Sequence, residues 1–155
     1  MAATYTAAKL FTEAAIVTYD HDPGTASALI TSPDGGTTKR YLDLADYSGF
    51  AGIVMATIAT GGPTLVDIVG AEDAAGTNAT TIVSSGTVAA DAVGDGVVIE
   101  CTAEQVKEVA VASGYALRYV GIRITCANSA DECAVTYIRH KPRFPKTALT
   151  ANFIS

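Results

Sequence analysis

The side chains that could carry out acid–base chemistry at neutral pH are few in this chain. It has two histidines, His21 and His140. His21 stands between Asp20 and Asp22 in a stretch of turn-forming residues, where the three side chains could bind a cation weakly; a solvated turn explains them more simply. His140 belongs to a basic segment, and we expect it at the surface or in an interface. No Gly-x-Ser-x-Gly elbow is present to expose a nucleophilic serine.

The cysteines, Cys101, Cys126 and Cys133, are too few and odd in number for a disulfide framework. No CxxC pair occurs, so zinc or redox chemistry has little support. Cys126 and Cys133 could face each other across a hairpin and form a bridge. Free cysteine is among the most buried residue types, so we predict buried free thiols and keep the bridge as the alternative.

Acidic residues offer two further kinds of chemistry. Paired carboxylates could hydrolyse glycosides, and six residues qualify by type alone: Asp67, Glu72, Asp73, Asp91, Asp95 and Glu100. A sugar cleft usually has an aromatic platform, but the chain has no Trp. The pairs at 72–73 and 91–95 fall in predicted loops where oxygen atoms could gather around calcium, but EF-hand spacing is lacking.

The glycines of 34–40 lack the spacing of a Walker phosphate-binding loop. We predict no catalytic residue, no cofactor and no metal site, and therefore not an enzyme.

Composition and charge limit the class of protein. The 155 residues, 49% hydrophobic and 17% charged, fit one domain with its own core. The net charge of −6 argues against nucleic acid as a partner, because phosphate contacts need Lys and Arg. The first residues have neither a basic region nor a long apolar run, so we predict no signal peptide and no membrane span. We expect a single soluble domain.

Short β-prone segments separated by turn residues recur along the chain. We predict about eight or nine strands, from the segments 16–19, 26–31, 38–42, 52–58, 64–69, 80–83, 97–101, 115–125 and 133–139. The segments 26–31 and 38–42 should form a hairpin, and the apolar run 52–58 should be a central strand covered on both faces. The pattern predicts a mainly β fold: an antiparallel β-sandwich or jelly-roll-like domain over 16–141, with an arm at 1–15 and an extended arm at 142–155.

One short helix is predicted near 103–112. Thr102 and Gln105 have the spacing of a capping box, Val106 and Val109 fall on one face, and Gly114 supplies the stop. The remaining apolar pattern predicts the core residues, which are Ile53, Val54, Ile58, Leu65, Ile68, Val98 or its alternate Ile99, Val120, Ile122, Ile124 and Val135.

Basic residues crowd toward the C-terminus, and no acidic residue follows Glu132. Pro142 and Pro145 disfavour regular pairing, which predicts an extended path. Apolar residues in a free arm would be exposed, so we expect a partner surface to cover them. The predicted partner-binding residues are Arg139, Lys141, Arg143, Lys146, Leu149, Phe153 and Ile154. We predict a homo-oligomer, with a trimer as the first candidate.

Four segments carry a resemblance to a known class of proteins. They are Ala45–Phe50 with the strand that follows to Ile58, Gly61–Leu65, Leu117–Arg123, and Val135–Arg139 with its Pro-containing tail. In these segments the chain resembles virion structural proteins of tailed bacteriophages, most closely head decoration or cement proteins. The resemblance implies a β-rich protein on the outer capsid surface, often trimeric, that binds the major capsid protein or another virion protein and stabilises the shell.

A second interpretation comes from the tyrosines. A carbohydrate- or cell-surface-binding β-sandwich, possibly part of a phage tail, would need a concave face with aromatic groups. The residues that could supply this face are Tyr19, Tyr41, Tyr47, Tyr115, Tyr119 and Tyr137. Their exposure in the folded chain distinguishes the two interpretations, because a sugar platform requires accessible rings.

Overall fold

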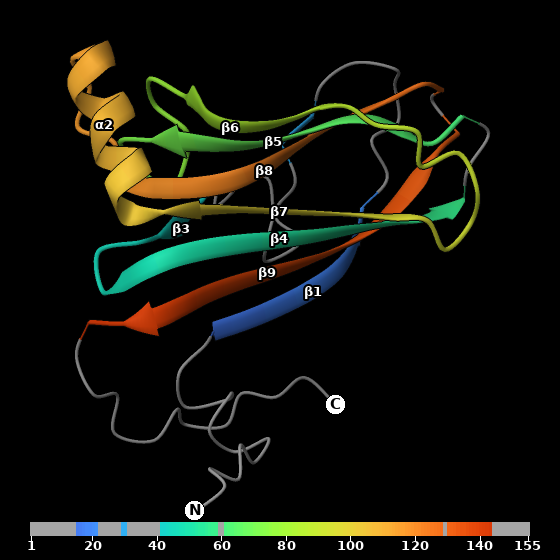
Figure 1. The fold of residues 1–155 in the computed structure, drawn as a ribbon, viewed down its shortest axis with the longest axis horizontal. Helices are drawn as coiled ribbons and strands as arrows, with labels where there is room; N and C mark the ends of the chain where they lie inside the picture. Colours follow the sequence, from blue (N-terminus) through green and yellow to red (C-terminus); the bar gives the residue numbers. More distant parts are fainter. Residues whose placement is uncertain (1–14, 22–28, 31–40, 59–60, 129, 144–155) are drawn as a thin grey trace, which may run out of the picture.

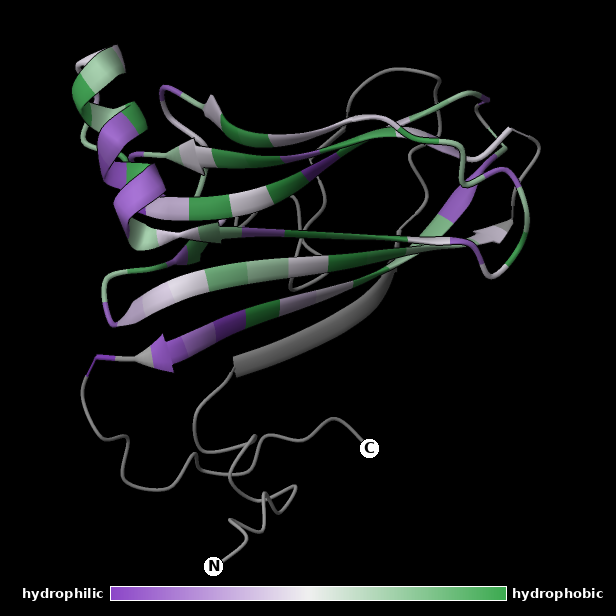
Figure 2. Ribbon diagram, in the orientation of Figure 1, coloured by the Kyte–Doolittle hydropathy of each residue, from purple (hydrophilic) through white to green (hydrophobic). Residues whose placement is uncertain are grey.

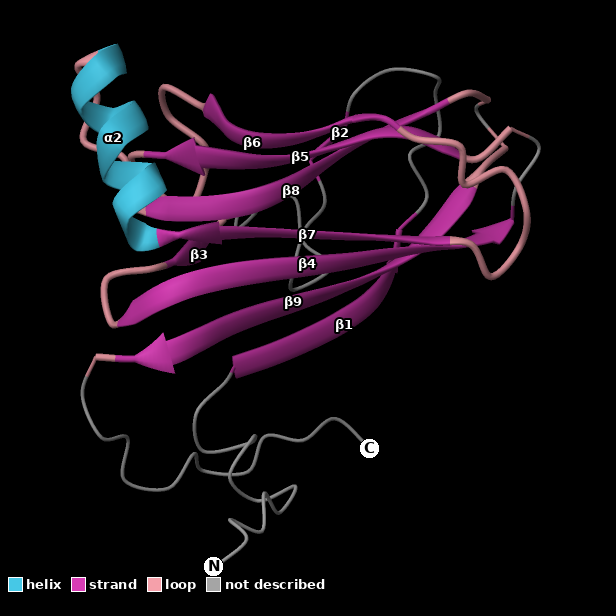
Figure 3. Ribbon diagram, in the orientation of Figure 1, coloured by secondary structure: helices cyan, strands magenta, loops and turns pink. Residues whose placement is uncertain are grey.

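A computed structural model describes residues 15–21, 29–30, 41–58, 61–128 and 130–143 of the chain (Figure 1). These residues form strands in two layers and one helix at one end of the layers (Figures 1 and 3). The elements are β1 Ala15–His21, β2 Leu29–Ile30, β3 Leu42–Asp43, β4 Tyr47–Ile58, β5 Pro63–Ala71, β6 Thr80–Thr87, β7 Gly96–Thr102, α2 Ala103–Ser113, β8 Tyr119–Cys126 and β9 Glu132–Pro142.

The strand pairing is nested. β1 pairs with β9, β2 and β3 with β8, β4 with β7, and β5 with β6, all antiparallel. Successive pairs alternate between a sheet of order β1-β9-β4-β7 and a sheet of order β2-β8-β5-β6, as if one long hairpin were rolled up. The pairings of β4 with β9 and β5 with β8 close the roll. With β2 and β3 taken as one interrupted strand, this is a jelly roll. The predicted mainly β, antiparallel fold is confirmed.

The inner faces of the two sheets share one core. Its fully buried members include Phe50 and Val54 from β4 and Ile68 and Ile122 from the other sheet. The sheets approach closely at Gly52, where a Cβ atom would lie 2.4 Å from Cδ1 of Ile122. Six predicted core residues are fully buried, namely Val54, Ile68, Val120, Ile122, Ile124 and Val135.

Strand alternation accounts for the rest of the core prediction: it confirms Ile99, one of the two predicted alternatives, and corrects Ile53 and Leu65. Ile99 faces inward, whereas Val98 is exposed. Ile53 and Leu65 are half-buried, and the side chain of Ile58 lies outside the described residues.

β4 is central in its sheet, between β7 and β9, but the expectation that both of its faces are covered is wrong. Val54 and Ala56 are buried, whereas Met55 between them is 44% exposed. In the register, the half-buried Ile53 pairs with the exposed Val98, so two apolar side chains are neighbours on the outer face of this sheet. An antiparallel sheet can leave one face to solvent, and an apolar run therefore does not prove burial on both faces.

Two further expectations about the first part of the chain are wrong. β2 and β3 lie on the same edge of β8 and do not pair with each other, so the hairpin of 26–31 with 38–42 is replaced by pairing to a distant strand. Asp20 and His21, expected in a turn, are the last residues of β1 and pair with Ala134 and Cys133. β1 pairs with an edge of β9, and β2 and β3 pair with an edge of β8. Local turn signals in the sequence do not reveal such distant partners.

The helix confirms its prediction. Oγ1 of Thr102 accepts a hydrogen bond from the Gln105 amide at 3.2 Å, and Oε1 of Gln105 accepts one from the Thr102 amide at 2.9 Å, which completes the capping box. Gly114, at φ 76°, ends the helix. Val106 is buried against the core, so α2 covers one end of the roll (Figure 1). Among the described residues, no helix has the length and apolarity to cross a membrane.

The strands extend one residue beyond the predicted domain at each end, because β1 begins at Ala15 and β9 ends at Pro142. Pro142 is the last residue of its strand and pairs with Tyr47. This is a position where the missing N–H of proline is tolerated. Residues 1–14 and 144–155, most of the two predicted arms, lie outside the described residues.

A buried ion pair lies on the outer face of the five-stranded sheet. Asp67, 3% exposed, stands opposite Arg123 in the register of β5 and β8. Nε of Arg123 donates to Oδ2 of Asp67 at 3.0 Å, and Nη2 also donates to Oγ1 of Thr81 at 2.7 Å. The other carboxylate oxygen, Oδ1, is buried without a hydrogen-bond partner. This carboxylate therefore depends on Arg123.

Replacing Arg123 with Ala should lower the free energy of unfolding by about 3–5 kcal/mol, because it leaves the Asp67 carboxylate buried and unpaired. The matched control is Arg118→Ala, which removes the partner of Asp43 from an exposed pair and should cost only a small part of that. Urea denaturation of both variants measures the difference. Equal losses would show that the burial of Asp67 carries no special penalty.

Candidate partner-binding site

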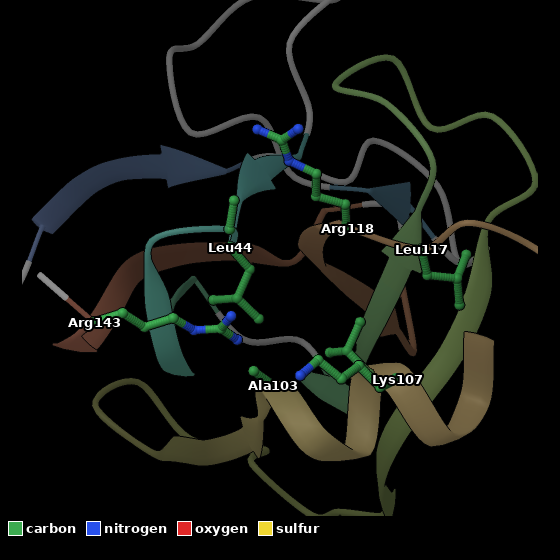
Figure 4. A pocket seen from close by; sticks show the side chains of 8 residues that line it. Leu44, Ala103, Lys107, Leu117, Arg118 and Arg143 are labelled. Atoms are coloured by element: carbon green, nitrogen blue, oxygen red, sulfur yellow. The ribbon is translucent and has the colours of Figure 1, made fainter. Parts of the chain in front are cut away.

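A small groove lies at the α2 end of the roll, with a volume of about 240 Å³ (Figure 4). We call it the basic groove; it is lined by Leu44, Ala45, Ala103, Val106, Lys107, Leu117, Arg118 and Arg143. Small-molecule and cofactor sites usually measure ~300–1,000 Å³. The basic groove is therefore sized for one or two side chains of another protein.

Backbone hydrogen bonds bring the walls of the groove together. The Leu44 amide donates to the Arg118 carbonyl at 3.1 Å, and the Arg143 amide donates to the Asp46 carbonyl at 2.8 Å. The first bond joins the segment after β3 to the segment before β8, and the second holds the end of β9 against the turn before β4. The capped start of α2 supplies the remaining wall.

The floor of the groove is apolar and its rim is cationic. Leu44, Ala103, Val106 and Leu117 form the floor and are almost fully covered by the rest of the chain. Lys107, Arg118 and Arg143 stand around it and are exposed. A site with this combination favours a partner that presents an apolar side chain next to carboxylates.

The three cations differ in whether a described carboxylate neutralises them. Nε of Arg118 donates to Oδ1 of Asp43 at 2.8 Å, and Nη2 donates to Oδ2. This pairing holds the pKa of the Asp43 carboxyl below its usual value, although burial opposes the shift. Among the described residues, no carboxylate lies within ion-pair distance of Lys107 or Arg143. Figure 4 shows these two side chains extending toward each other across the groove, so an anion between them would relieve their repulsion.

The predicted partner-binding residues divide into three groups. Arg143 lines the groove, and Lys141 is exposed on the end of β9. Arg139 is used inside the chain: its guanidinium lies 4.8 Å from the centre of the Tyr47 ring, and Nη1 donates to the Asp43 carbonyl at 3.0 Å. It therefore fixes the turn that forms one wall of the groove. Lys146, Leu149, Phe153 and Ile154 lie outside the described residues.

The sequence analysis missed Lys107, Arg118 and the apolar floor as parts of a site. Lys107 is an ordinary exposed helix residue in sequence, and Arg118 stands in a short connection before a strand. Figure 2 shows the hydrophilic end of β9 at the same end of the roll as α2. Only this tertiary arrangement, which no local pattern predicts, brings the residues to one groove.

His140 packs within the chain. Its ring lies so close to Gly49 that a Cβ atom there would be 2.1 Å from Cε1. Burial, together with the nearby charge of Lys141, lowers the pKa of the imidazole and keeps the ring neutral at physiological pH. Its role is therefore to cover the glycine-containing start of β4.

The acidic loop after β5 uses its oxygen atoms to hold its own shape. Oδ1 of Asp73 accepts hydrogen bonds from the amides of 75, 76 and 77, and the Thr77 hydroxyl donates to Oδ2 at 2.6 Å. The hydrogen bond from Thr77 is the main cause that lowers the pKa of this carboxyl. Glu72 accepts from Asn78 and from the Ala116 amide. Within the described ranges, no three His, Cys, Asp or Glu residues are grouped to hold a metal ion.

All three cysteines are buried free thiols, as predicted. Burial, assisted by the charge of Glu100, raises the pKa of Cys101 to about 12. A hydrogen bond with Cys126 is the main cause that raises the pKa of Cys133, and burial adds to it. A thiol nucleophile must be ionised, so these two residues are poorly suited to attack a substrate.

The buried thiols should be inert in the folded protein. At pH 8, Cys101 and Cys133 should not react with a water-soluble disulfide reagent such as DTNB over minutes, because they are neither ionised nor accessible. All three thiols should react at once in concentrated urea, which provides the control. Rapid reaction of a folded thiol at position 101 or 133, located by mass spectrometry, would contradict this expectation.

The chain shows no significant similarity to a protein-family model, to a curated protein or to a solved structure. The strand order identifies the fold, and the side chains of the groove carry the inference about function. The basic groove combines an apolar floor with two cations, Lys107 and Arg143, that have no carboxylate partner among the described residues.

Proposed function

We propose that this chain is a structural protein of a virus particle, which binds a neighbouring protein on the outer capsid surface and stabilises the shell. The observation that carries the proposal is the basic groove, because its size and its two unpaired cations suit a protein partner. The jelly roll agrees with the proposal, since viral capsid domains often have this fold. Lectins share the fold, so it does not decide the function by itself.

The basic groove includes the residue that directly precedes the C-terminal arm in the sequence. Arg143 lies on the rim of the groove and immediately precedes residues 144–155. The arm contains Lys146 and the apolar residues Leu149, Phe153 and Ile154. A partner bound in the groove could therefore contact both surfaces. Repetition of such a contact over a shell would multiply a weak interaction through avidity.

The buried tyrosines weigh against the carbohydrate-binding alternative. Tyr41, Tyr47 and Tyr137 are buried, and Tyr119 is half-buried. Of the tyrosines with a described side chain, Tyr115 alone is exposed, at 41%. Sugars stack on accessible aromatic faces, and no group of such faces exists in the described part of the chain. The tyrosine side chains mainly fill the interior and support the turn near Arg139.

The proposal predicts that virus particles purified from the source contain many copies of this chain, detectable by mass spectrometry. After the chain is stripped from the particles, the wild-type protein should rebind, more weakly at high salt. Lys107→Glu or Arg143→Glu should weaken rebinding at least tenfold, because each places a like charge opposite an acidic partner. Lys141→Glu makes the same charge change on β9, two residues before Arg143 and outside the groove, and should have a smaller effect. Absence of the chain from particles would refute the proposed function.

Removal of residues 144–155 tests the arm separately. The shortened chain keeps every described strand, so it should fold, with an unchanged circular dichroism spectrum. If the arm covers a neighbour, the deletion should reduce rebinding to stripped particles and lower the oligomer mass measured by light scattering. Unchanged rebinding and unchanged mass would show that the arm is dispensable.

A further inference from the structure

A tight turn at the far end of the molecule displays an exposed apolar side chain. Val93, between β6 and β7, is 69% exposed. The Asp95 amide donates to the Ala92 carbonyl at 3.0 Å, and Oδ2 of Asp95 accepts from the Ala92 amide at 3.1 Å. Ala56 of β4 forms two further backbone hydrogen bonds with the turn, at 2.8 and 2.9 Å. The turn is thus fixed at both ends, which lowers the entropic cost of binding through it.

Acidic residues flank this side chain. Asp91 and Asp95 lie two residues before and two residues after Val93, and we call residues 91–95 the acidic turn. Asp91 is exposed, and no described residue donates a hydrogen bond to its carboxylate. No Lys or Arg occurs in the sequence between Arg40 and Lys107, so the turn has no basic neighbour along the chain.

The acidic turn cannot reach the basic groove of its own chain. β7 begins at Gly96, directly after the turn, and ends at Thr102, the cap of α2. Its pairing with β4, from Met55 to Gly49, keeps it extended. Seven residues in this conformation span about 20 Å at ~3.3 Å per residue. The two surfaces therefore lie at opposite ends of the roll (Figure 1).

The two surfaces complement each other. The basic groove has an apolar floor between two cations, Lys107 and Arg143, that form no ion pair with a described residue. The acidic turn has one apolar side chain between two carboxylates. A cavity of about 240 Å³ has room for the Val93 side chain and part of its turn. At the rim, the carboxylates of the turn would meet cations of the groove, so the electrostatic interaction would be attractive. At the centre, Val93 would meet the apolar floor.

We propose that the basic groove binds the acidic turn of a second copy of this chain, with Val93 on the apolar floor and Asp91 and Asp95 near Lys107 and Arg143. The inference rests on the proposed function, because it names the neighbour that the groove binds in the particle. The two surfaces differ, so the contact is head to tail and can repeat into a ring or a chain of copies. One turn in one groove is a small interface, so each contact is weak in solution. Many such contacts, repeated over the particle, bind strongly together through avidity.

Sedimentation velocity at low salt tests the contact with three full-length proteins. The wild type should self-associate with rising concentration up to about 1 mM, and salt should weaken this association. Asp91→Lys alters only the turn, and Lys107→Glu alters only the groove. Each variant alone should show at least tenfold weaker self-association. An equimolar mixture should associate again, because the intact turn of one variant fits the intact groove of the other, and the two reversed charges also attract each other.

The mixture also controls for folding, since a variant that had lost its structure could not contribute its unchanged surface. A wild type that stays monomeric at every concentration overturns the inference, and so does a mixture that forms no pairs. Rebinding to stripped particles separates this inference from the proposed function. If Lys107→Glu weakens rebinding while Asp91→Lys rebinds and self-associates like the wild type, the groove binds a different virion protein. The proposed function then stands and the self-contact is refuted.

Discussion

The pairing of β9 with β4 is the interaction on which the rest of the structure depends. It joins residues 74 to 95 positions apart in sequence, from Tyr47 with Pro142 to Ile58 with Glu132, and closes the roll. Phe50 and Tyr137, with ring centres 6.5 Å apart, pack in the core beneath it. Among the described strands, β1 pairs with the other edge of β9 alone, so its place in the sheet also follows from this pairing. Contacts this distant in sequence are characteristic of slowly folding β domains.

The same pairing determines where the basic groove forms. The register that places Phe50 opposite Arg139 carries the end of β9 past the turn at 43–47. Arg139 then stacks on Tyr47 and binds the Asp43 carbonyl, and Arg143 binds the Asp46 carbonyl. The groove is therefore a consequence of strand register: a shift by one residue would turn Arg139 to the opposite face of the sheet. Arg139 and Arg143 therefore contribute both to the fold of the chain and to the proposed partner site.

Local patterns predicted the elements whose stabilising interactions are local. The helix was predictable because its capping box lies within four residues, and β8 because Val120, Ile122 and Ile124 alternate with polar positions. The partners of β2 and β3 were not predictable, because the choice between each other and the edge of β8 depends on distant pairing. Of the groove, only Arg143 was anticipated, through the charge of its segment. Lys107 and Leu44 have no unusual sequence context, so only the folded chain reveals them.

Net charge and local charge lead to different conclusions about binding. A charge of −6 argues against wrapping nucleic acid, but it hides a groove in which two of the three rim cations have no described carboxylate partner. The gap in Lys and Arg from 41 to 106 leaves the acidic turn at the other end without a nearby cation in sequence. Because unlike surfaces occupy opposite ends, electrostatics alone would orient a second molecule head to tail. The buried apolar floor and the exposed Val93 supply the part of the contact that salt does not screen.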